Sequence, residues 1–258
     1  MRSCLSWPCI WAIRRSSNLF RLTFERFLSG SHSLSCMAEL KFKTIGEDRA
    51  RRHIETYVSA NLPYGWPLYD QDPSPDILVG VDLAAPALLS YPIKSKYLDQ
   101  MGRTPEADSS NPYHALQCAL NAFVSATPVS TFQGVSSDAV RNLAVRSSSD
   151  TPIGPEDFAL FVRCLDAAEP CKGIRSVAVT KILHRKRPDL VPINDSRVRK
   201  FYGVKNSYAP LFEAIHADLQ DKETTEMLMT LAEPHVGIDG RPMSVLRALD
   251  IVVWMHMA

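Results

Sequence analysis

Apolar residues repeat at helical spacing along most of this chain, and this periodicity limits the folds that the chain can adopt. The clearest example runs from Ser244 to Met257, where Ser244 is a good helix cap. Its apolar positions share one side of a helix: Val245, Leu246, Leu249, Val252 and Val253. Alternating patterns typical of strands are scarce. We therefore expect an all-α fold, a multi-helix globular domain.

The same spacing predicts the remaining helices. They are expected over 46–60, 77–88, 113–126, 135–146, 155–168, 174–187, 208–218 and 224–233. Asp76 should cap the second of these, which is apolar on most sides and should lie in the core. Asp82 lies inside that apolar run, so it should be hydrogen-bonded across the core or line a cavity.

Residues 37–258 are expected to form the helical domain. Proline and aromatic residues make 63–75 an extended connector, 104–112 reads as a loop, and the Ser-rich stretch 147–154 is a candidate internal boundary. The first 36 residues hold five Arg, eight Ser and one acid. They are either a mitochondrial-type transit peptide or an extension upstream of a true start at Met37. We expect a cytoplasmic protein, or a mitochondrial one if the transit interpretation holds.

Several classes of protein are not indicated. No apolar run approaches the roughly 18 residues that a membrane span needs. The six cysteines include no Cys-x-x-Cys pair and no histidine at zinc-finger spacing, and three of them lie in the first 36 residues. The glycines form no phosphate-binding or dinucleotide pattern. The expectation is a reducing compartment, no metal and no cofactor.

The formal net charge of +1 hides a strong asymmetry. Residues 1–36 carry +4, residues 37–171 carry −6, residues 172–205 carry +8 and residues 206–258 carry −5. A basic block of this density usually faces a polyanion, an acidic partner or another part of the same surface. Internal charge balance is the simpler alternative.

Two basic sets form this block, one on each side of a proline-containing turn. The first is His184, Arg185, Lys186 and Arg187, at the expected end of a helix before Pro188. Cations there complement the helix dipole, so part of the set has a structural explanation. The second set consists of Arg197, Arg199 and Lys200, and the helix dipole does not explain it.

Asn194 or Asp195 should cap the helix that carries the second set. An acid beside several guanidinium groups stays ionised, and it could orient a water or stabilise a developing positive charge. Asp195 is therefore either a candidate functional acid or a helix cap and ion-pair partner.

The chain resembles an uncharacterised, mainly bacterial family over roughly residues 40–258. The residues that carry this resemblance are Lys181, Arg187, Pro188, Pro192, Asp195 and Val198, together with Asp-Leu-Ala-Ala-Pro at 82–86 and Leu-Arg-Ala-Leu-Asp at 246–250 followed by Trp254. No activity follows from this resemblance.

The central stretch is also similar, more distantly, to the helix-hairpin-helix DNA glycosylase superfamily. In that superfamily a Gly-x-Gly hairpin opens a helix and holds a DNA phosphate, and an Asp beyond a proline-containing turn assists departure of the flipped base. By this resemblance Gly173 matches the second hairpin glycine and Asp195 the catalytic acid.

The chain departs from the superfamily at two positions. Cys171 replaces the first hairpin glycine, which hinders close approach to a phosphate. Arg175 stands where bifunctional members place the nucleophilic lysine, and a guanidinium forms no Schiff base. A monofunctional glycosylase is the enzyme that this pattern still allows.

Two other pairs have structural interpretations. Glu213 and His216 have the spacing of a carboxylate-bridged metal site, but no second such pair exists in the sequence. Cys164 and His184 would make a nucleophile and a base, yet no nucleophile motif surrounds the cysteine.

Three functional hypotheses follow. The first is a nucleic-acid-associated, helix-hairpin-helix-like protein with Asp195 as functional acid. Its anion-binding residues would be Arg175, Lys181, His184, Arg185, Lys186, Arg187, Arg197, Arg199 and Lys200. The second is a non-catalytic interaction protein whose basic segment docks on an acidic partner or on acidic parts of its own chain. The third is an enzyme on a small anionic substrate, bound by Lys181, His184 and Arg187.

Overall fold

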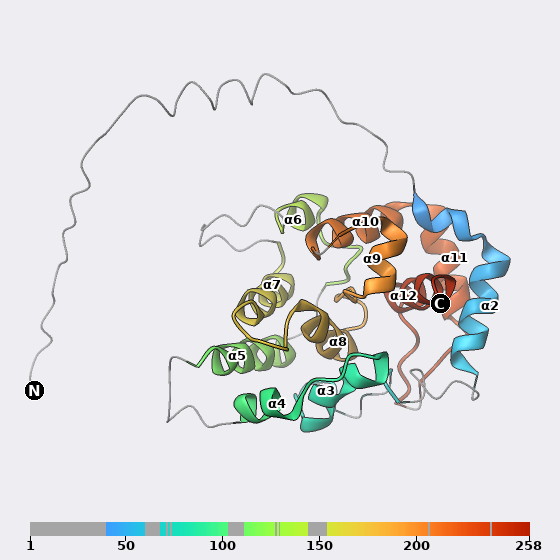
Figure 1. Ribbon diagram of the computed structural model, residues 1–258. Coiled ribbons are helices and arrows are strands. Elements are labelled where there is room, and N and C mark those ends of the chain that lie inside the picture. Colours follow the sequence, from blue (N-terminus) through green and yellow to red (C-terminus); the bar gives the residue numbers. More distant parts are fainter. Residues whose placement is uncertain are drawn as a thin grey trace, which may run out of the picture. The chain divides into compact units, whose positions relative to one another are not determined.

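The computed structural model describes residues 40–59, 68–70, 72, 74–102, 111–126, 128, 130–143, 154–205, 207–237 and 239–258. Within these ranges the regular structure is helical, and the sole β-pairing is an isolated bridge between Val236 and Pro242 (Figure 1). The expected all-α fold is confirmed. None of the helices in these ranges is long and apolar enough to cross a bilayer.

Two short 3₁₀ helices, η1 and η2, accompany the α-helices. In chain order the elements are η1 (Lys41–Ile45), α2 (Glu47–Val58), α3 (Gly80–Ala84), η2 (Ala85–Leu89), α4 (Ser95–Gly102), α5 (Pro112–Ser125), α6 (Ser137–Arg141), α7 (Glu156–Ala168), α8 (Ser176–Lys186), α9 (Ser196–Tyr202), α10 (Ala209–Gln220), α11 (Lys222–Ala232) and α12 (Val245–His256).

Short polar side chains fix where many of these helices begin. Asn111, Ser136, Asp195, Asp221 and Ser244 each accept a hydrogen bond from a backbone N–H in the first turn of the following helix. These N–H groups have no partner within the helix, so a side-chain oxygen satisfies them. The predicted caps Ser244 and Asp195 are confirmed.

The helix expected over 77–88 is wrong in its start and in its burial. Asp82 Oδ2 accepts a hydrogen bond from the backbone N–H of Val79 at 2.8 Å, so α3 begins at Gly80 and Asp76 lies outside it. The side of α3 that carries Val81 faces solvent, since Val81 is 54% exposed. Asp82 itself is fully buried and hydrogen-bonded, as expected.

Other boundaries differ less. The helix expected over 135–146 begins at Ser137, because Ser136 caps it, and it ends at Arg141. The short elements η1 and α4 had no prediction. The segments 1–36, most of the loop 104–112 and most of the candidate boundary 147–154 lie outside the described residues, so those predictions stay open.

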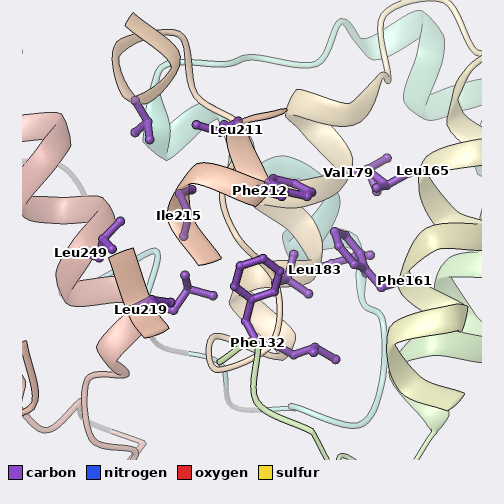
Figure 2. Close-up of a cluster of buried hydrophobic side chains, with 14 of the residues drawn as sticks. Phe132, Phe161, Leu165, Val179, Leu183, Leu211, Phe212, Ile215, Leu219 and Leu249 are labelled. Atoms are coloured by element: carbon purple, nitrogen blue, oxygen red, sulfur yellow. The ribbon is translucent and has the colours of Figure 1, made fainter. Parts of the chain in front are cut away.

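α12 is the central helix of the domain and packs against α2, α9 and α11. It is buried around most of its circumference, because Arg247, Ala248, Asp250 and Ile251 are buried in addition to the apolar side that the sequence predicts. A second group of packed helices joins α5, α7 and α8, visible in Figure 1. Figure 2 shows the core between the groups, where Phe132, Phe161 and Phe212 lie among leucines from α7, α8 and α10.

Candidate functional site

The cations at the end of α8 are buried. Arg185 Nε donates to Asp82 Oδ1 at 3.0 Å, and the same guanidinium donates to the carbonyl oxygens of Leu68 and Tyr69. Lys186 Nζ lies 2.7 Å from Asp82 Oδ2 and 2.9 Å from Asp72 Oδ2. The side chains of Lys186, Asp72 and Asp82 are inaccessible to solvent, and that of Arg185 is nearly so.

Arg187 ends α8 and is buried in the same way. Its guanidinium donates to the carbonyl oxygens of Pro75, Val124 and Ala126, and lies 3.3 Å from the exposed carboxylate of Asp76. Arg187 therefore ties the connector to the end of α5. This role needs a fork of several donors, which arginine supplies and lysine does not.

His184 lies on the same helix and is neutral at physiological pH. Burial, together with the nearby Arg247, lowers the pKa of His184 to about 3, although a contact of Nδ1 with the carbonyl oxygen of Val191 at 2.6 Å opposes the shift. A neutral Nδ1–H donates to that carbonyl. The ring stacks on Tyr69 with its centroid 6.3 Å away.

Much of the basic block is thus balanced inside the protein. Asp72, Asp76 and Asp82 from the segment before η2 face Arg185, Lys186 and Arg187. The sequence shows only that two segments far apart in the chain carry opposite net charges, and it does not show that their side chains pair. The predicted anion-binding residues on α8 and Arg187 directly after it have protein acceptors in hydrogen-bonding range. Of the others, Arg175 at the hairpin and Lys200 on α9 are exposed, and Arg197 and Arg199 on α9 are partly exposed.

Asp195 caps α9 and also lines a pocket. Its Oδ1 accepts from the backbone N–H of Arg197 at 2.9 Å, and its Oδ2 lies 3.0 Å from Lys181 Nζ. Lys181 Nζ also donates to the carbonyl oxygen of Leu89 at 2.7 Å, and it lies 5.8 Å from the centre of the Tyr91 ring. The cap and ion-pair roles predicted for Asp195 are confirmed, and its side chain also lines a pocket, while its role as a functional acid stays a prediction.

Two adjoining cavities share Leu89, Ser90, Lys181, Asp195 and Trp254 in their linings, and we call the smaller one the inner chamber and the larger one the mouth. The chamber, about 20 Å³, is only large enough for one water molecule, whereas the mouth holds about 230 Å³. We call these together the Asp195 pocket. The chamber is lined by Tyr57, Leu88, Leu89, Ser90, Lys181, Ile193, Asp195, Arg247, Asp250, Ile251 and Trp254.

The mouth of the Asp195 pocket carries positive charge. The Arg197 guanidinium lies over Trp254 with 4.2 Å between its carbon and the ring centre, and its Nη1 atom is buried with no hydrogen-bond partner among the described residues. Arg199 also lines the mouth, and its Nη1 donates to Asn194 Oδ1 at 2.7 Å. A buried guanidinium nitrogen without an acceptor is costly, so it marks a place where a ligand acceptor would bind.

The inner chamber contains charged groups that the sequence analysis did not select. Asp250 lies on α12 and accepts from Arg247 Nη1, and Arg247 also makes a two-point contact with Asp70 and a bond to the Tyr57 hydroxyl. Arg247, Asp250 and Trp254 belong to the C-terminal pattern that suggested family resemblance. That pattern was the sequence signal that could have identified them. These three residues are spaced three and four positions apart, so they share one face of a helix.

The hairpin before α8 has the backbone expected of a tight turn. Gly173 has φ +76°, and a Cβ there would lie 2.2 Å from the Tyr97 ring of α4. Cys171 is buried, burial raises the pKa of its thiol to about 11, and Sγ faces the carbonyl oxygen of Ala167. Lys172 and Arg175 on either side of Gly173 are exposed.

A second pocket of about 510 Å³ lies at the other end of α8, with Arg187, Pro188, Asp189 and Arg241 in its lining. Both guanidinium groups there are paired, Arg241 with Asp239 at 2.8 Å and Arg187 with Asp76. The Asp195 pocket is the stronger candidate because it contains a buried donor without an acceptor.

The structure groups no three His, Cys, Asp or Glu side chains at metal-binding geometry in the part of the chain that it describes. His216 lies on α10 with Nε2 2.8 Å from the carbonyl oxygen of Val135, a structural contact. Cys164 is buried in the core, where burial raises the pKa of its thiol.

Residues 139–257 match the model of a family described as a family of unknown function (DUF6308). The matched segment includes Lys181, Asp195, Asp250 and Trp254, and therefore most charged residues of the Asp195 pocket. No curated protein and no solved structure matches the chain. The match supports the resemblance to an uncharacterised family, while the similarity to helix-hairpin-helix glycosylases stays a prediction.

Proposed function

We propose that this chain is a nucleic-acid-associated protein of the helix-hairpin-helix kind, with the Asp195 pocket as its functional site. The observation that carries the proposal is Arg197, which lines the mouth of the pocket with Asp195 and whose buried Nη1 has no acceptor among the described residues. Phosphate oxygens are the acceptors that guanidinium groups bind best.

Exposed cations on two nearby parts of the sequence extend this interpretation. Lys172, Arg175 and Lys200 are exposed, and Arg199, which lines the mouth, is partly exposed. They lie on the hairpin before α8 and on α9, the helix that Asp195 caps. DNA phosphates are the expected partners of such a surface, and Asp195 is the acid that a monofunctional glycosylase would use to stabilise positive charge on a sugar.

The test measures binding of short DNA duplexes and single strands as salt is raised. Because phosphate contacts release counterions, the logarithm of affinity should fall linearly with the logarithm of salt concentration. Replacing Arg175, Arg199 and Lys200 together by Ala should lower the steepness of that line by about 2 to 3 and weaken binding at least about ten-fold at low salt.

A matched control removes three exposed cations elsewhere, namely Arg52 on α2, Arg141 on α6 and Lys222 on α11. Both triple variants lose the same net charge, so a difference between them reports on the location of the charges. Equal weakening by the two variants, or no binding by the native protein at low salt, would refute the proposal.

The buried ion pairs favour a second candidate, a non-catalytic interaction protein. Because Arg185 and Lys186 pair with Asp82 and Asp72, much of the basic segment already docks on an acidic part of its own chain. This hypothesis expects that Asp195→Asn lowers thermal stability and changes no activity on DNA. A well-folded Asp195→Asn protein that lost base-excision activity would contradict it.

A further inference from the structure

Two carboxylates line the Asp195 pocket, and they differ in how their oxygens are used. Both oxygens of Asp195 are engaged, one by the backbone of α9 and the other by Lys181. Asp250 Oδ2 accepts from Arg247 Nη1. Within the described residues, no hydrogen bond reaches Asp250 Oδ1. Asp250 therefore has one oxygen that accepts no hydrogen bond from these residues, whereas each oxygen of Asp195 already accepts one.

The groups that surround Asp250 come from every element packed against it. They are Arg247 on its own helix, Tyr57 on α2, Tyr69 and Asp70 from the connector, Lys181 on α8, and Asp195 and Tyr202 at the two ends of α9. Burial raises the pKa of Asp250 to about 6, Arg247 opposes this shift, and the negative charge of Asp195 adds to it. A neutral Asp250 is thus accessible near neutral pH.

We propose that Asp250, in its protonated form, donates a hydrogen bond from Oδ1 to the ligand of the Asp195 pocket and thereby determines which ligands bind. A neutral carboxyl group is a donor, so its partner on the ligand must be an acceptor. The ring nitrogens and carbonyl oxygens of nucleotide bases are such acceptors. The choice of a nucleotide as ligand rests on the proposed function.

The dimensions and charges of the pocket support one nucleotide as the occupant. The mouth, at about 230 Å³, falls below the roughly 300 to 1,000 Å³ of pockets for drug-sized ligands, so one small unit fits it. Arg197 and Arg199 at the mouth would bind the phosphate. The base would lie against Trp254, which lines both the mouth and the chamber, and one acceptor atom on its edge would take the place of the single water that the chamber can hold beside Asp250.

The experiment measures binding of the four deoxynucleoside 5′-monophosphates, as methyl esters whose phosphate has no proton to lose in this range, to the full chain by calorimetry between about pH 6.5 and pH 8. If the ligand binds only when Asp250 is protonated, the dissociation constant of at least one nucleotide should rise about ten-fold per pH unit above pH 6. Binding at about pH 7.5 should also take up about one proton, seen by repeating the titration in buffers of different ionisation enthalpy.

Asp250→Asn separates the hydrogen bond from the titration. The amide still donates a hydrogen bond but carries no ionisable proton, so binding by this variant should be retained and become nearly independent of pH. Asp218→Asn is the matched control, since burial also raises the pKa of Asp218 to about 6, and Asp218 lies outside the lining of the Asp195 pocket. The control should keep the pH dependence of the native protein.

Each outcome decides the inference. No binding of any of the four nucleotides at millimolar concentration, or binding without proton uptake, overturns it, and the calorimetry on the native protein decides even if Asp250→Asn fails to fold. Binding to longer DNA whose pH dependence is unchanged by Asp250→Asn would leave the proposed function standing and remove this inference. Nucleotide binding with proton uptake but no binding to DNA would support this inference and refute the proposed function.

Discussion

Lys186 is a fully buried ammonium group, and its neighbours explain how it is tolerated. It contacts Asp72, Asp82 and the carbonyl oxygen of Ser74. A buried charge is stable only when it is paired and hydrogen-bonded, because desolvation would otherwise outweigh every gain. Asp82 serves both Lys186 and Arg185, so one carboxylate is surrounded by two cations.

Lys186→Met should lower the free energy of unfolding by about 3–5 kcal/mol, because it leaves Asp72 and Asp82 buried without their common cation. Lys200→Met removes the same charge from an exposed site on α9 and should change stability by about 0.5 kcal/mol or less. Urea denaturation of both variants checks this. Equal losses would mean that the buried pair contributes nothing particular.

The sequence indicated Asp195 as a candidate functional acid but not its whole setting. Asp195 was predicted from its position before a basic helix, and the structure places it at a helix start and in a pocket. Asp250 was not selected, because an acid three residues after an arginine on a helix is also an ordinary surface pair. Only its burial makes it a candidate.

At the level of elements, the hairpin between α7 and α8 shows how a turn positions a site. Gly173 adopts a left-handed conformation and leaves room for Tyr97, whose ring stacks on Tyr113 at 6.3 Å between centroids. The Tyr113 hydroxyl in turn donates to the carbonyl oxygen of Lys172. The hairpin is thereby fixed against α4 and α5.

Gly173→Ala should lower the free energy of unfolding by about 2 kcal/mol or more, because the residue would be strained at φ +76° and its Cβ would overlap the Tyr97 ring. Gly80→Ala is the control. Gly80 lies at the start of α3 with no atom within 4 Å of an added Cβ and no positive φ, so this change should be neutral or slightly stabilising. Thermal unfolding of the two variants provides the comparison. A Gly173→Ala protein as stable as Gly80→Ala would show that the hairpin shifts without strain.

The wrong start of the helix expected over 77–88 has its cause in a contact between distant elements. Apolar spacing predicted one helix from Ile77 to Leu88, but Asp82 stops the helix from extending toward Asp76 by accepting the N–H of Val79. That carboxylate is held in place by Arg185 and Lys186, more than a hundred residues later in the sequence. Local periodicity cannot register a cap whose position depends on a distant helix.

In the whole molecule, a buried acid and a buried histidine change the free energy of unfolding in opposite directions as pH falls. The pKa of His184 is about 3 in the folded protein, below its ordinary value of 6.5, so the unfolded chain binds the proton more tightly and stability falls as pH drops through this window. The pKa of Asp218 is raised from 3.8 to about 6 by burial, so its contribution favours folding at low pH and is lost as pH rises through 6.

We therefore expect the stability advantage of the native protein over His184→Asn to shrink by about 3–5 kcal/mol between pH 6.5 and pH 3, because the variant lacks the group that must be charged on unfolding. The advantage over Asp218→Asn should instead grow by about 1–3 kcal/mol between pH 6 and pH 4. Urea denaturation at a series of pH values measures both differences. Parallel curves for all three proteins would show that neither group is linked to folding.

The sequence alone determined the helical class, most helix positions and several helix starts of this protein, because periodicity and capping are local properties of the chain. It also determined that Asp195 lies beside basic residues. Tertiary structure decided which of those cations face solvent: the connector brings Asp72 and α3 brings Asp82 onto α8, which buries Lys186, while Arg197 stays at the mouth of a pocket. The physical reason is that desolvation and pairing of a charge depend on neighbours in space, which come from segments far apart in the sequence.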